Sequence, residues 1–315
     1  MFPGSVPCQF RNDHVYAPLP DYARASVPDL SNGLRFFFAW WRRRPFVLST
    51  HGSLLGYRKY HQPASRQIAA RLYDLLTLKT VAKRAQAVVV SSEMEYQEAL
   101  EFGIRKDRLH LIPDGIEVPA LSPQPEEPQG APLHLLFAGP LTRIRRQDLL
   151  LRAARKLTVP FRITLIATNE IQNSPEDKAY LNELQKLSQV LGIQDRVGFL
   201  QNPSPEDLQR GYADADIFFY LSSYETSGET LIEAAAHGLP IIATPVGPAG
   251  AVVSTGQSGF IVPADPDMIC DRILQISDPG TRRRFGRASR ENVVKHCGWT
   301  SVMERYTELY RSLLI

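Results

Sequence analysis

Apolar and polar residues form two kinds of pattern that alternate along this chain. Short apolar runs, bounded by Gly, Pro or polar residues, are typical of buried strands. Between these runs, apolar residues recur every three or four positions, as on the buried face of a helix. The runs predicted as strands are 45–51, 87–90, 108–112, 133–137, 161–167, 197–200, 216–221, 240–244 and 259–262.

The stretches between the strands carry residues that begin and end helices. Ser92 and Ser204 are candidate N-caps, and Pro205 suits a first helical position. Gly103 is expected to end the helix that begins at Ser92. The succession of strand and helix predicts an α/β protein with parallel sheets. The predicted helices are 64–85, 92–102, one from 147, 174–191, one from 204, the Ala-rich run after 228, helices within 265–290, and 299–314.

The length of 315 residues suffices for two domains, each with its own hydrophobic core. A hydrophobic content of 43% and a charged content of 22% are those of a soluble globular protein. Five prolines within 119–132 predict a linker there. We therefore expect an N-terminal domain over 1–118 and a C-terminal domain over 133–315.

The formal net charge is +3, which is too small to predict a nucleic-acid partner. The positive charge is clustered at 42–44 and 282–284. Cys8, Cys270 and Cys297 lack the spacing of a metal or redox site, which fits a reducing cytoplasm. We find no secretory signal and no apolar run of membrane-spanning length, and we expect a cytoplasmic protein.

A short aromatic run, LRFFFAWW, occupies residues 34–41 and is followed by three arginines. One interpretation is an interfacial helix, which would bring 34–44 to an anionic membrane surface as a peripheral contact. The other is a helix that packs on a sheet and has a solvated basic end. Eight residues are few for an interfacial anchor, so we favour the packed helix.

Two carboxylates, Glu225 and Glu233, stand eight positions apart within 221–240, LSSYETSGETLIEAAAHGLP. The apolar run before this segment predicts a strand, and the Ala-rich run around Glu233 predicts a helix that ends at Gly238-Leu-Pro240. The loop with Glu225 therefore lies at the carboxyl end of a strand, where open α/β sheets bind ligands. The N-terminus of the following helix offers free N–H groups and a partial positive charge suited to a phosphate.

The same segment resembles the signature of the family 4 retaining glycosyltransferases, which are nucleotide-sugar enzymes with the GT-B fold. The resemblance implies that Glu225 faces the transferred sugar and that Glu233 holds the nucleotide ribose. It also implies that the backbone at Gly228 approaches the diphosphate or the sugar hydroxyls. The alternative is that both Glu side chains are solvated helix residues. The residues that match the signature are Ser222, Glu225, Gly228, Glu233, Ala234 and Gly238-Leu-Pro240.

The resemblance extends to the loop that follows the first strand of the C-terminal domain. In the family this loop reads Gly-Arg, then Lys-Gly and Asp, and its Arg and Lys clamp the diphosphate. Aligned on Gly139 and Asp148, the chain has Pro140 at the Arg position and Arg145 at the Lys position. We expect Arg145, helped by Arg143, to bind the diphosphate, because guanidinium suits phosphate oxygens. The resemblance also implies that Gly139, at the start of this loop, lies at the diphosphate. The alternative is a solvated basic loop.

Three further residues take expected roles from the resemblance. His51 ends a predicted strand, and the family's histidine at such a strand end reaches the donor sugar or diphosphate. An imidazole there could donate to an oxygen near neutral pH; the alternative is a satisfied loop histidine. Gln201 and Asn202 follow the strand at 197–200, where relatives contact the base through backbone groups.

Asp214-Ala-Asp216 has the spacing of a metal-binding Asp-x-Asp motif. It lies at a predicted junction between a helix and a strand, and GT-B enzymes do not generally hold a metal there. We therefore expect no metal site at this motif.

The opening of the chain departs from the family pattern. Residues 1–44 show no resemblance and no Gly-rich loop after a strand, so the N-terminal domain is expected to be an incomplete Rossmann-like unit. The expected fold is α/β of GT-B type, with two Rossmann-like domains that have parallel sheets. That opening normally helps to bind the acceptor. We expect an acceptor site that is relocated, reduced or supplied by a partner in a homo- or hetero-oligomer; the alternative is that the chain is a fragment of a longer or split protein.

The resemblance implies a retaining glycosyltransferase of hexosyltransferase type, with Glu225 and His51 as its catalytic residues. It would move a sugar from a UDP- or GDP-sugar to a hydroxyl of a glycan, a lipid-linked acceptor or a small molecule, without a cofactor. The alternative is a non-catalytic nucleotide-sugar-binding or scaffold protein that kept the donor domain and needs a partner for activity.

Overall fold

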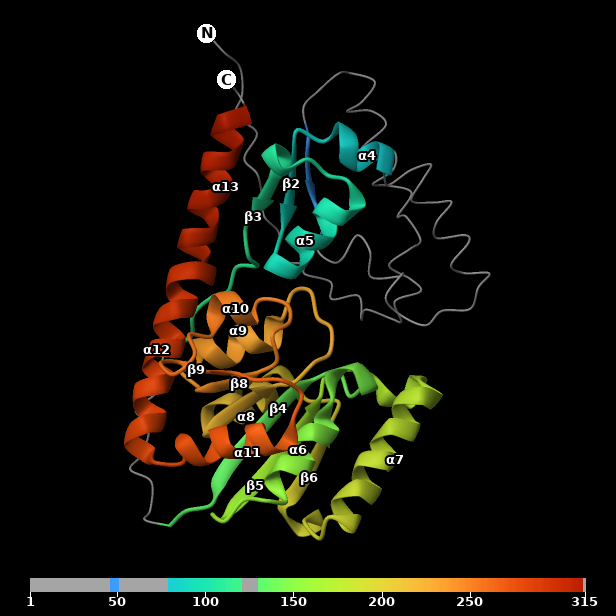
Figure 1. Cartoon of the computed structure of the whole chain (residues 1–315), viewed down its shortest axis with the longest axis vertical. Coiled ribbons are helices and arrows are strands. Elements are labelled where there is room, and N and C mark those ends of the chain that lie inside the picture. The colour runs from blue at the N-terminus through green and yellow to red at the C-terminus, as the bar shows by residue number, and fades with distance from the viewer. Residues whose placement is uncertain (1–45, 51–78, 121–129, 314–315) are drawn as a thin grey trace.

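The computed structural model describes residues 46–50, 79–120 and 130–313, and in these ranges the strands form two sheets (Figure 1). The strand order is β1-β2-β3 in the first sheet and β6-β5-β4-β7-β8-β9 in the second. Every pair of neighbouring strands is parallel. The predicted α/β class with parallel sheets is confirmed.

Helices cover both faces of the first sheet. Its side chains point alternately to the two faces, so each face carries apolar residues that a helix can bury. On one face, Val88 and Val90 pack against Ala99 and Phe102. The elements of this part are β1 (Val47–Ser49), α4 (Lys79–Arg84), β2 (Ala87–Val90), α5 (Glu93–Phe102) and β3 (Leu109–Leu111).

The other face of the first sheet is covered by the last helix, α13 (Trp299–Leu313). Ala87 and Val89 pack against Val302 and Leu309 of that helix, which runs beside the first sheet in Figure 1. The C-terminal segment therefore completes the core of a sheet that is built near the start of the chain.

The second sheet lies between two layers of helices and is the larger of the two. One face packs on α6, α7 and α11, and the other on α8, α9, α10 and α12. Its elements are β4 (Leu133–Gly139), α6 (Gln147–Ala154), β5 (Phe161–Ala167), α7 (Pro175–Val190), β6 (Val197–Gln201), α8 (Pro205–Asp214), β7 (Ile217–Tyr220), α9 (Glu229–Ala236), β8 (Ile241–Ala243), α10 (Ala249–Val252), β9 (Gly259–Ile261), α11 (Pro266–Gln275) and α12 (Pro279–Cys297).

The chain reverses its direction of winding between β4 and β7. From β4 it proceeds outward through β5 to the edge strand β6, and then it returns to place β7 on the other side of β4. Such a switch point leaves a crevice at the carboxyl ends of the two strands. The loops that follow β4 and β7 are therefore the ones placed to form a ligand site.

The predicted helix ends are confirmed where their caps are described. The Ser92 side chain accepts from the backbone N–H of Glu95, and Gly103 ends α5 in the left-handed conformation with φ 99°. Ser204 forms a capping box with Asp207 at the start of α8. These local signals decided the element boundaries because they satisfy backbone groups that the helix leaves unpaired.

Some features of the fold were not predicted, and some predictions cannot be compared with it. Helix α10 was not predicted, and α12 continues to Cys297, beyond the predicted limit at 290. The aromatic run at 34–44 and most of the helix predicted at 64–85 lie outside the described residues. Within the described ranges, no helix has the length and apolar character needed to cross a bilayer.

Candidate active site

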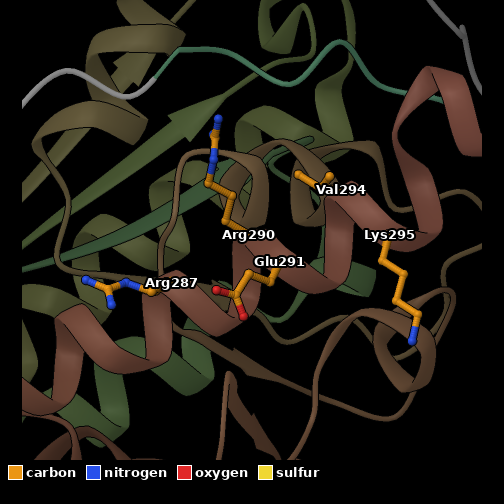
Figure 2. A pocket seen from close by; sticks show the side chains of 5 residues that line it. All are labelled: Arg287, Arg290, Glu291, Val294 and Lys295. Carbon is orange, nitrogen blue, oxygen red and sulfur yellow. The ribbon is translucent and has the colours of Figure 1, made fainter.

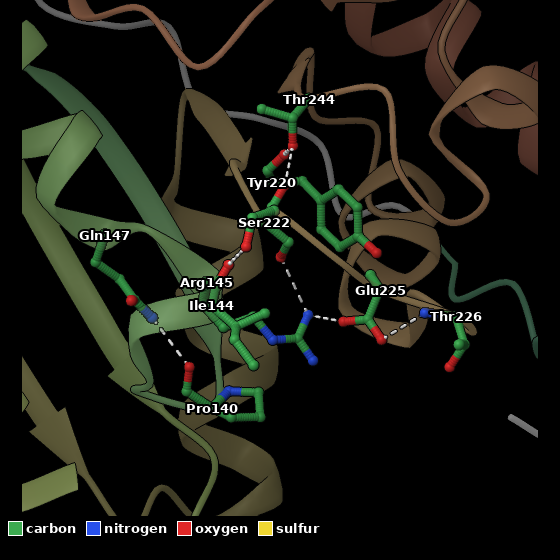
Figure 3. A network of polar contacts seen from close by, with 10 residues as sticks. Pro140, Ile144, Arg145, Gln147, Tyr220, Ser222, Glu225, Thr226 and Thr244 are labelled. Carbon is green, nitrogen blue, oxygen red and sulfur yellow. Dashed lines mark hydrogen bonds and ion pairs between the residues drawn. The ribbon is translucent and has the colours of Figure 1, made fainter. Parts of the chain in front are cut away.

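Two loops meet at the switch point of the second sheet (Figure 3). One follows β4 and contains the short 3₁₀ helix Arg143–Arg145; the other joins β7 to α9. The backbone N–H of Ser223 donates to the carbonyl oxygen of Ile144 at 2.8 Å, which holds the loops together. The Thr244 hydroxyl, after β8, donates to the carbonyl oxygen of Ser222 at 2.6 Å. The site is thus fastened to three adjacent strands.

Arg145 and Glu225 form an ion pair at the centre of this arrangement. Their side chains are 16% and 6% exposed, so the pair is shielded from solvent. A second Glu225 oxygen accepts from the backbone N–H of Thr226 at 3.0 Å. The Arg145 guanidinium also lies 3.4 Å from the Ser222 hydroxyl oxygen. The structure therefore brings together the cation and the carboxylate that the sequence singled out.

Gly228 begins α9 and also takes part in the packing of the site loop. It has φ 66° and ψ 36°, a left-handed conformation that glycine adopts without strain. A Cβ added there would lie 2.5 Å from Pro248 Cγ and 2.9 Å from the Tyr220 hydroxyl oxygen. Among the described residues no side chain caps this helix, so the N–H groups of its first turn have no side-chain acceptor there.

Gly139 ends β4 close to the same helix start. Its φ is 148°, and a Cβ added there would lie 3.9 Å from the Thr230 hydroxyl oxygen in the first turn of α9. The two glycines predicted to approach a diphosphate therefore lie on the same side of the crevice.

Glu233 lies further along α9, where a buried tyrosine holds its carboxylate. The Tyr212 hydroxyl donates to it at 2.8 Å, and Tyr212 is 0% exposed. Burial raises the pKa of Glu233, while the hydrogen bond from Tyr212 works in the opposite direction. The His237 ring stacks on Tyr212 with 5.0 Å between ring centres. Tyr212 was not predicted as a site residue; the available signal was its position in the last turn of α8, shortly before β7.

The Arg143 side chain points toward α7 rather than toward the ion pair of Arg145 and Glu225. It pairs with Glu183 of α7, and its guanidinium lies 5.4 Å from the centre of the Tyr180 ring. Both members of the ion pair are well exposed. The structure therefore separates Arg143 from Arg145, although the two residues stand two positions apart in the sequence.

Two residues of the loop after β4 differ from the family pattern: Arg146 stands at the glycine of Lys-Gly, and Pro140 stands at the arginine. Arg146, at the glycine position, has φ 55°, which is the conformation that a glycine would adopt most easily. The carbonyl oxygen of Pro140, at the arginine position, accepts from the side-chain amide of Gln147 at 3.0 Å. Gln147 is 0% exposed, so it supports this loop from inside.

The residues expected at the nucleotide base lie at the edge of the sheet. Gln201 ends β6, and Asn202 follows it with φ 51°. The strand β5 separates β6 from β4. His51, the remaining predicted site residue, lies outside the described residues.

Asp214 and Asp216 take part in contacts that connect β7 with its neighbours. One Asp216 oxygen accepts from the backbone N–H of His134 at 2.7 Å, and the other pairs with Arg282 at 3.3 Å. The His134 ring nitrogen Nδ1 lies 2.7 Å from the Asp214 carbonyl oxygen. Within the described part of the chain, no group of three or more His, Cys, Asp or Glu residues is arranged to hold a metal ion.

Two pockets lined by described residues lie outside the central network. One, of about 440 Å³, lies between α5 and the turn after β8; its walls include Glu98, Glu101 and Gly247. The other, of about 410 Å³, lies along α12 (Figure 2). There Arg290 donates to the backbone carbonyl groups of Pro119 and Ala236, which gives it a structural role.

The sheet order and the paired loops at the switch point define an α/β protein of the class that binds ligands at the carboxyl ends of parallel strands. The family model "Glycosyl transferases group 1" matches residues 121–292, which is more than half of the chain. The chain belongs to this family. The model "Glycosyltransferase Family 4" matches residues 23–119. The expectation that residues 1–44 carry no family resemblance is therefore wrong for 23–44.

Two curated relatives show the extent of the similarity. The D-inositol 3-phosphate glycosyltransferase of Corynebacterium urealyticum is 26% identical over 87% of this chain and 66% of its own length. The protein of the same name from Acidothermus cellulolyticus is 27% identical over 74% of this chain and 55% of its own. The chain thus spans between about half and two thirds of the length of these relatives.

Solved structures share the fold. Sucrose-phosphate synthase from Thermosynechococcus elongatus is 27% identical, with a TM-score of 0.71 over 89% of this chain and 72% of that one. Anabaena Alr3699/HepE, solved in complex with UDP and glucose, is 18% identical and has the same TM-score over 89% of this chain and 75% of its own. The predicted GT-B type of α/β fold is confirmed.

Proposed function

We propose that this chain is a retaining glycosyltransferase that moves a sugar from a nucleoside diphosphate sugar to an acceptor hydroxyl. The ion pair of Arg145 and Glu225 beside the start of α9 carries the proposal. It combines a cation for the diphosphate, a carboxylate for the sugar and a helix N-terminus. Membership of the family supports the reaction type, and the UDP bound in the HepE complex supports the kind of donor.

The difficult step in such a transfer is to break the bond between the sugar and the diphosphate. Negative charge develops on the leaving diphosphate, and fixed positive groups stabilise it without reorganising. Arg145 and the first N–H groups of α9 would supply this stabilisation. When the diphosphate binds, it competes with Glu225 for the guanidinium. Glu225 can then accept hydrogen bonds from the sugar.

The remaining atoms of the reaction balance without a metal ion or other cofactor. The acceptor oxygen forms the new glycosidic bond on the face that the diphosphate leaves, so the configuration is kept. The leaving diphosphate takes the proton of the acceptor hydroxyl. His51 is proposed to donate a hydrogen bond to the donor sugar or the diphosphate.

Glu233 is proposed to bind the ribose hydroxyls of the nucleotide. The Tyr212 hydroxyl fixes one of its oxygens, which orients the carboxylate before the ligand arrives. Gln201 and Asn202 are proposed to contact the base. In this assignment Arg145 carries the charge for the diphosphate, because Arg143 is paired with Glu183.

The test is calorimetric titration of the purified chain with UDP, GDP and the corresponding nucleotide sugars, with donor hydrolysis followed in the same samples. We expect micromolar binding of one nucleotide, on the order of the affinities that enzymes show for substrates, and slow hydrolysis of its sugar. Binding without hydrolysis or transfer would favour the alternative of a nucleotide-sugar-binding scaffold. Failure to bind any nucleotide would refute both functions.

Two variants separate the roles of the two carboxylates. We expect Glu233→Ala to weaken nucleotide binding about tenfold, because the ribose loses a charged hydrogen-bond partner. We expect Glu225→Ala to spare nucleotide binding or to tighten it, because the diphosphate no longer competes with Glu225 for Arg145. We expect the same variant to reduce turnover by about a hundredfold or more, as expected for a group that acts on the transition state. Equal loss of binding in both variants would contradict this division.

A further inference from the structure

A hydrogen bond joins the site loop to the helix α5 of the first sheet. The Tyr224 hydroxyl donates to a carboxylate oxygen of Glu98 at 3.1 Å. Glu98 is 2% exposed, although glutamate is among the residues least often buried. A buried carboxylate persists where hydrogen bonds replace its water. The burial of Glu98 therefore depends on groups such as the Tyr224 hydroxyl.

This contact lies next to the proposed catalytic carboxylate. Tyr224 immediately precedes Glu225, so any movement of its backbone is transmitted to Glu225 through one peptide unit. In the turn after β8, a Cβ added at Gly247 would lie 3.2 Å from the Glu225 carbonyl oxygen and 3.3 Å from its Cγ. The dipeptide Tyr224-Glu225 is thus held between α5 and the turn after β8.

The same two walls enclose the pocket of about 440 Å³. Glu98 contributes to it from α5, and Gly247 contributes from the turn after β8. Glu98, whose carboxylate Tyr224 binds, is therefore among the residues that line this pocket. A molecule in that pocket would contact the residues that hold the site loop.

We propose that Glu98 and Tyr224 are positioning residues, which fix Glu225 relative to the first sheet through their hydrogen bond. The inference rests on the proposed transfer function, because it assigns the pair an effect on the transition state at Glu225. Arg145 and the Thr226 N–H orient the Glu225 carboxylate relative to the second sheet, whereas the Tyr224–Glu98 bond sets its position relative to α5 and the first sheet. Small misplacements of a reacting group are costly to rate.

The experiment compares Tyr224→Phe, Glu98→Gln and Glu98→Ala in the full chain, with kcat and donor KM measured for hydrolysis or transfer. Tyr224→Phe removes one hydroxyl and is expected to lower kcat about tenfold to a hundredfold, the scale of loss that follows when a reacting group is slightly misplaced. Donor KM is expected to change less than about twofold, because the nucleotide contacts are retained. Glu98→Gln keeps an accepting oxygen and should retain most of the activity, whereas Glu98→Ala should resemble Tyr224→Phe.

Matched controls and a double variant complete the design. Glu101→Gln makes the same charge change one turn along α5 at an exposed position, and Tyr310→Phe removes a hydroxyl from a tyrosine that is 50% exposed. Both should keep wild-type kcat. Combining Tyr224→Phe with Glu98→Ala should cost no more than the worse single change, because both remove the same bond.

The outcomes distinguish this inference from the proposed function. An active wild-type chain with wild-type kcat in Tyr224→Phe overturns the positioning role and leaves the proposed function intact. If Tyr224→Phe lowers Tm and lowers kcat/KM mainly by raising KM, the contact is merely structural, and the positioning role is also overturned. A wild-type chain that neither transfers nor hydrolyses refutes the proposed function and the inference with it.

Discussion

The charges of Arg145 and Glu225 depend on each other because both side chains are shielded from solvent. Removing one member of a buried ion pair leaves the other charge without compensation. This makes the proposed donor site sensitive to single changes. It also means that the pair can report on folding as well as on ligand binding.

We expect Arg145→Ala to lower the free energy of unfolding by about 3 kcal/mol, the usual cost of an uncompensated buried charge. The double variant Arg145→Met with Glu225→Gln should recover most of that loss, because it leaves no buried charge. Urea-induced unfolding measures both. Arg143→Ala is the control, since its pair with Glu183 is exposed and should be worth less than about 1 kcal/mol. Equal losses in Arg145→Ala and Arg143→Ala would contradict the shielding of the central pair.

Glu233 predicts a dependence of stability on pH. Burial raises the pKa of its carboxyl group, so the folded state binds the proton more tightly than the unfolded state. Stability therefore falls as pH rises from the ordinary glutamate pKa through the raised one. Glu233→Gln removes this titration and keeps an oxygen that can accept from Tyr212.

We accordingly expect Glu233→Gln to be more stable than the wild type at about pH 8 and equally stable at about pH 3, where the carboxyl group is protonated in both states. Thermal unfolding across this range gives the measurement. A gain in stability with weaker nucleotide binding is the pattern expected of a residue retained for function. A variant that is less stable than the wild type at about pH 8 would contradict the role of burial at Glu233.

At the scale of elements, the start of α9 depends on Gly228. Gly228→Ala combines a left-handed backbone with contacts to Pro248 and Tyr220 that are too short for a methyl group. We expect it to cost more than about 2 kcal/mol and to abolish turnover, because the site loop must move. Unfolding and donor hydrolysis are the measurements.

Gly256→Ala is the matched control for that change. It shares the positive φ, at 79°, but a Cβ there meets no described atom within 4 Å. It should cost only about 1 kcal/mol and keep activity. Comparable losses in both glycine variants would show that the backbone conformation alone, rather than the close packing at Gly228, is responsible.

Sequence patterns predicted elements well where local physics decides them. The cap at Ser92, the capping box at Ser204 and the Gly103 terminator each satisfy nearby backbone groups, and the structure confirms all three. Helix α10 has four residues and no side-chain cap, so no periodic pattern or cap marked it in advance. Arg143 was grouped with Arg145 by proximity in sequence, whereas the structure pairs Arg143 with Glu183 of α7 and Arg145 with Glu225 in the loop between β7 and α9.

Local sequence patterns could not predict the contacts between segments that are distant in the sequence. The partners of Tyr224 and Glu233, which are Glu98 and Tyr212, follow from how the helices are placed around the sheets. The helix at 299–314 was predicted, but a helix prediction does not tell which sheet the helix covers. The network of Asp214 and Asp216 likewise arises from the strand pairing of β4 with β7.

On the scale of the whole molecule, two crossing segments connect the sheets. The chain passes from the first sheet to the second near Ile116 and returns at the junction of α12 and α13. The Ile116 N–H donates to the Cys297 carbonyl oxygen at 2.8 Å, and the Trp299 N–H donates to the Ile116 carbonyl oxygen at 3.2 Å. Gly115 packs closely on the Trp299 ring. The two crossing segments are therefore joined to each other by backbone hydrogen bonds and by the packing of Gly115 on Trp299.

The packing of α13 on the first sheet gives a prediction at this scale. Leu309 is 4% exposed and lies against that sheet. Leu309→Ala should cost about 2–4 kcal/mol, as other buried leucine truncations do, and should increase hydrogen exchange in β2 more than in β4. Met303→Ala, at a 46% exposed position of the same helix, is the control. Equal loss of protection in both sheets would show that they unfold as one unit.

The order in which a ribosome releases this chain makes the position of α13 significant. Strands β1 to β3 emerge early, yet Ala87 and Val89 find their apolar partners in Val302 and Leu309, which are synthesised after the entire second sheet. Until then, that face of the first sheet is exposed to water and to other nascent chains, a condition that favours aggregation and chaperone binding. The first sheet to be synthesised is therefore the last to complete its core.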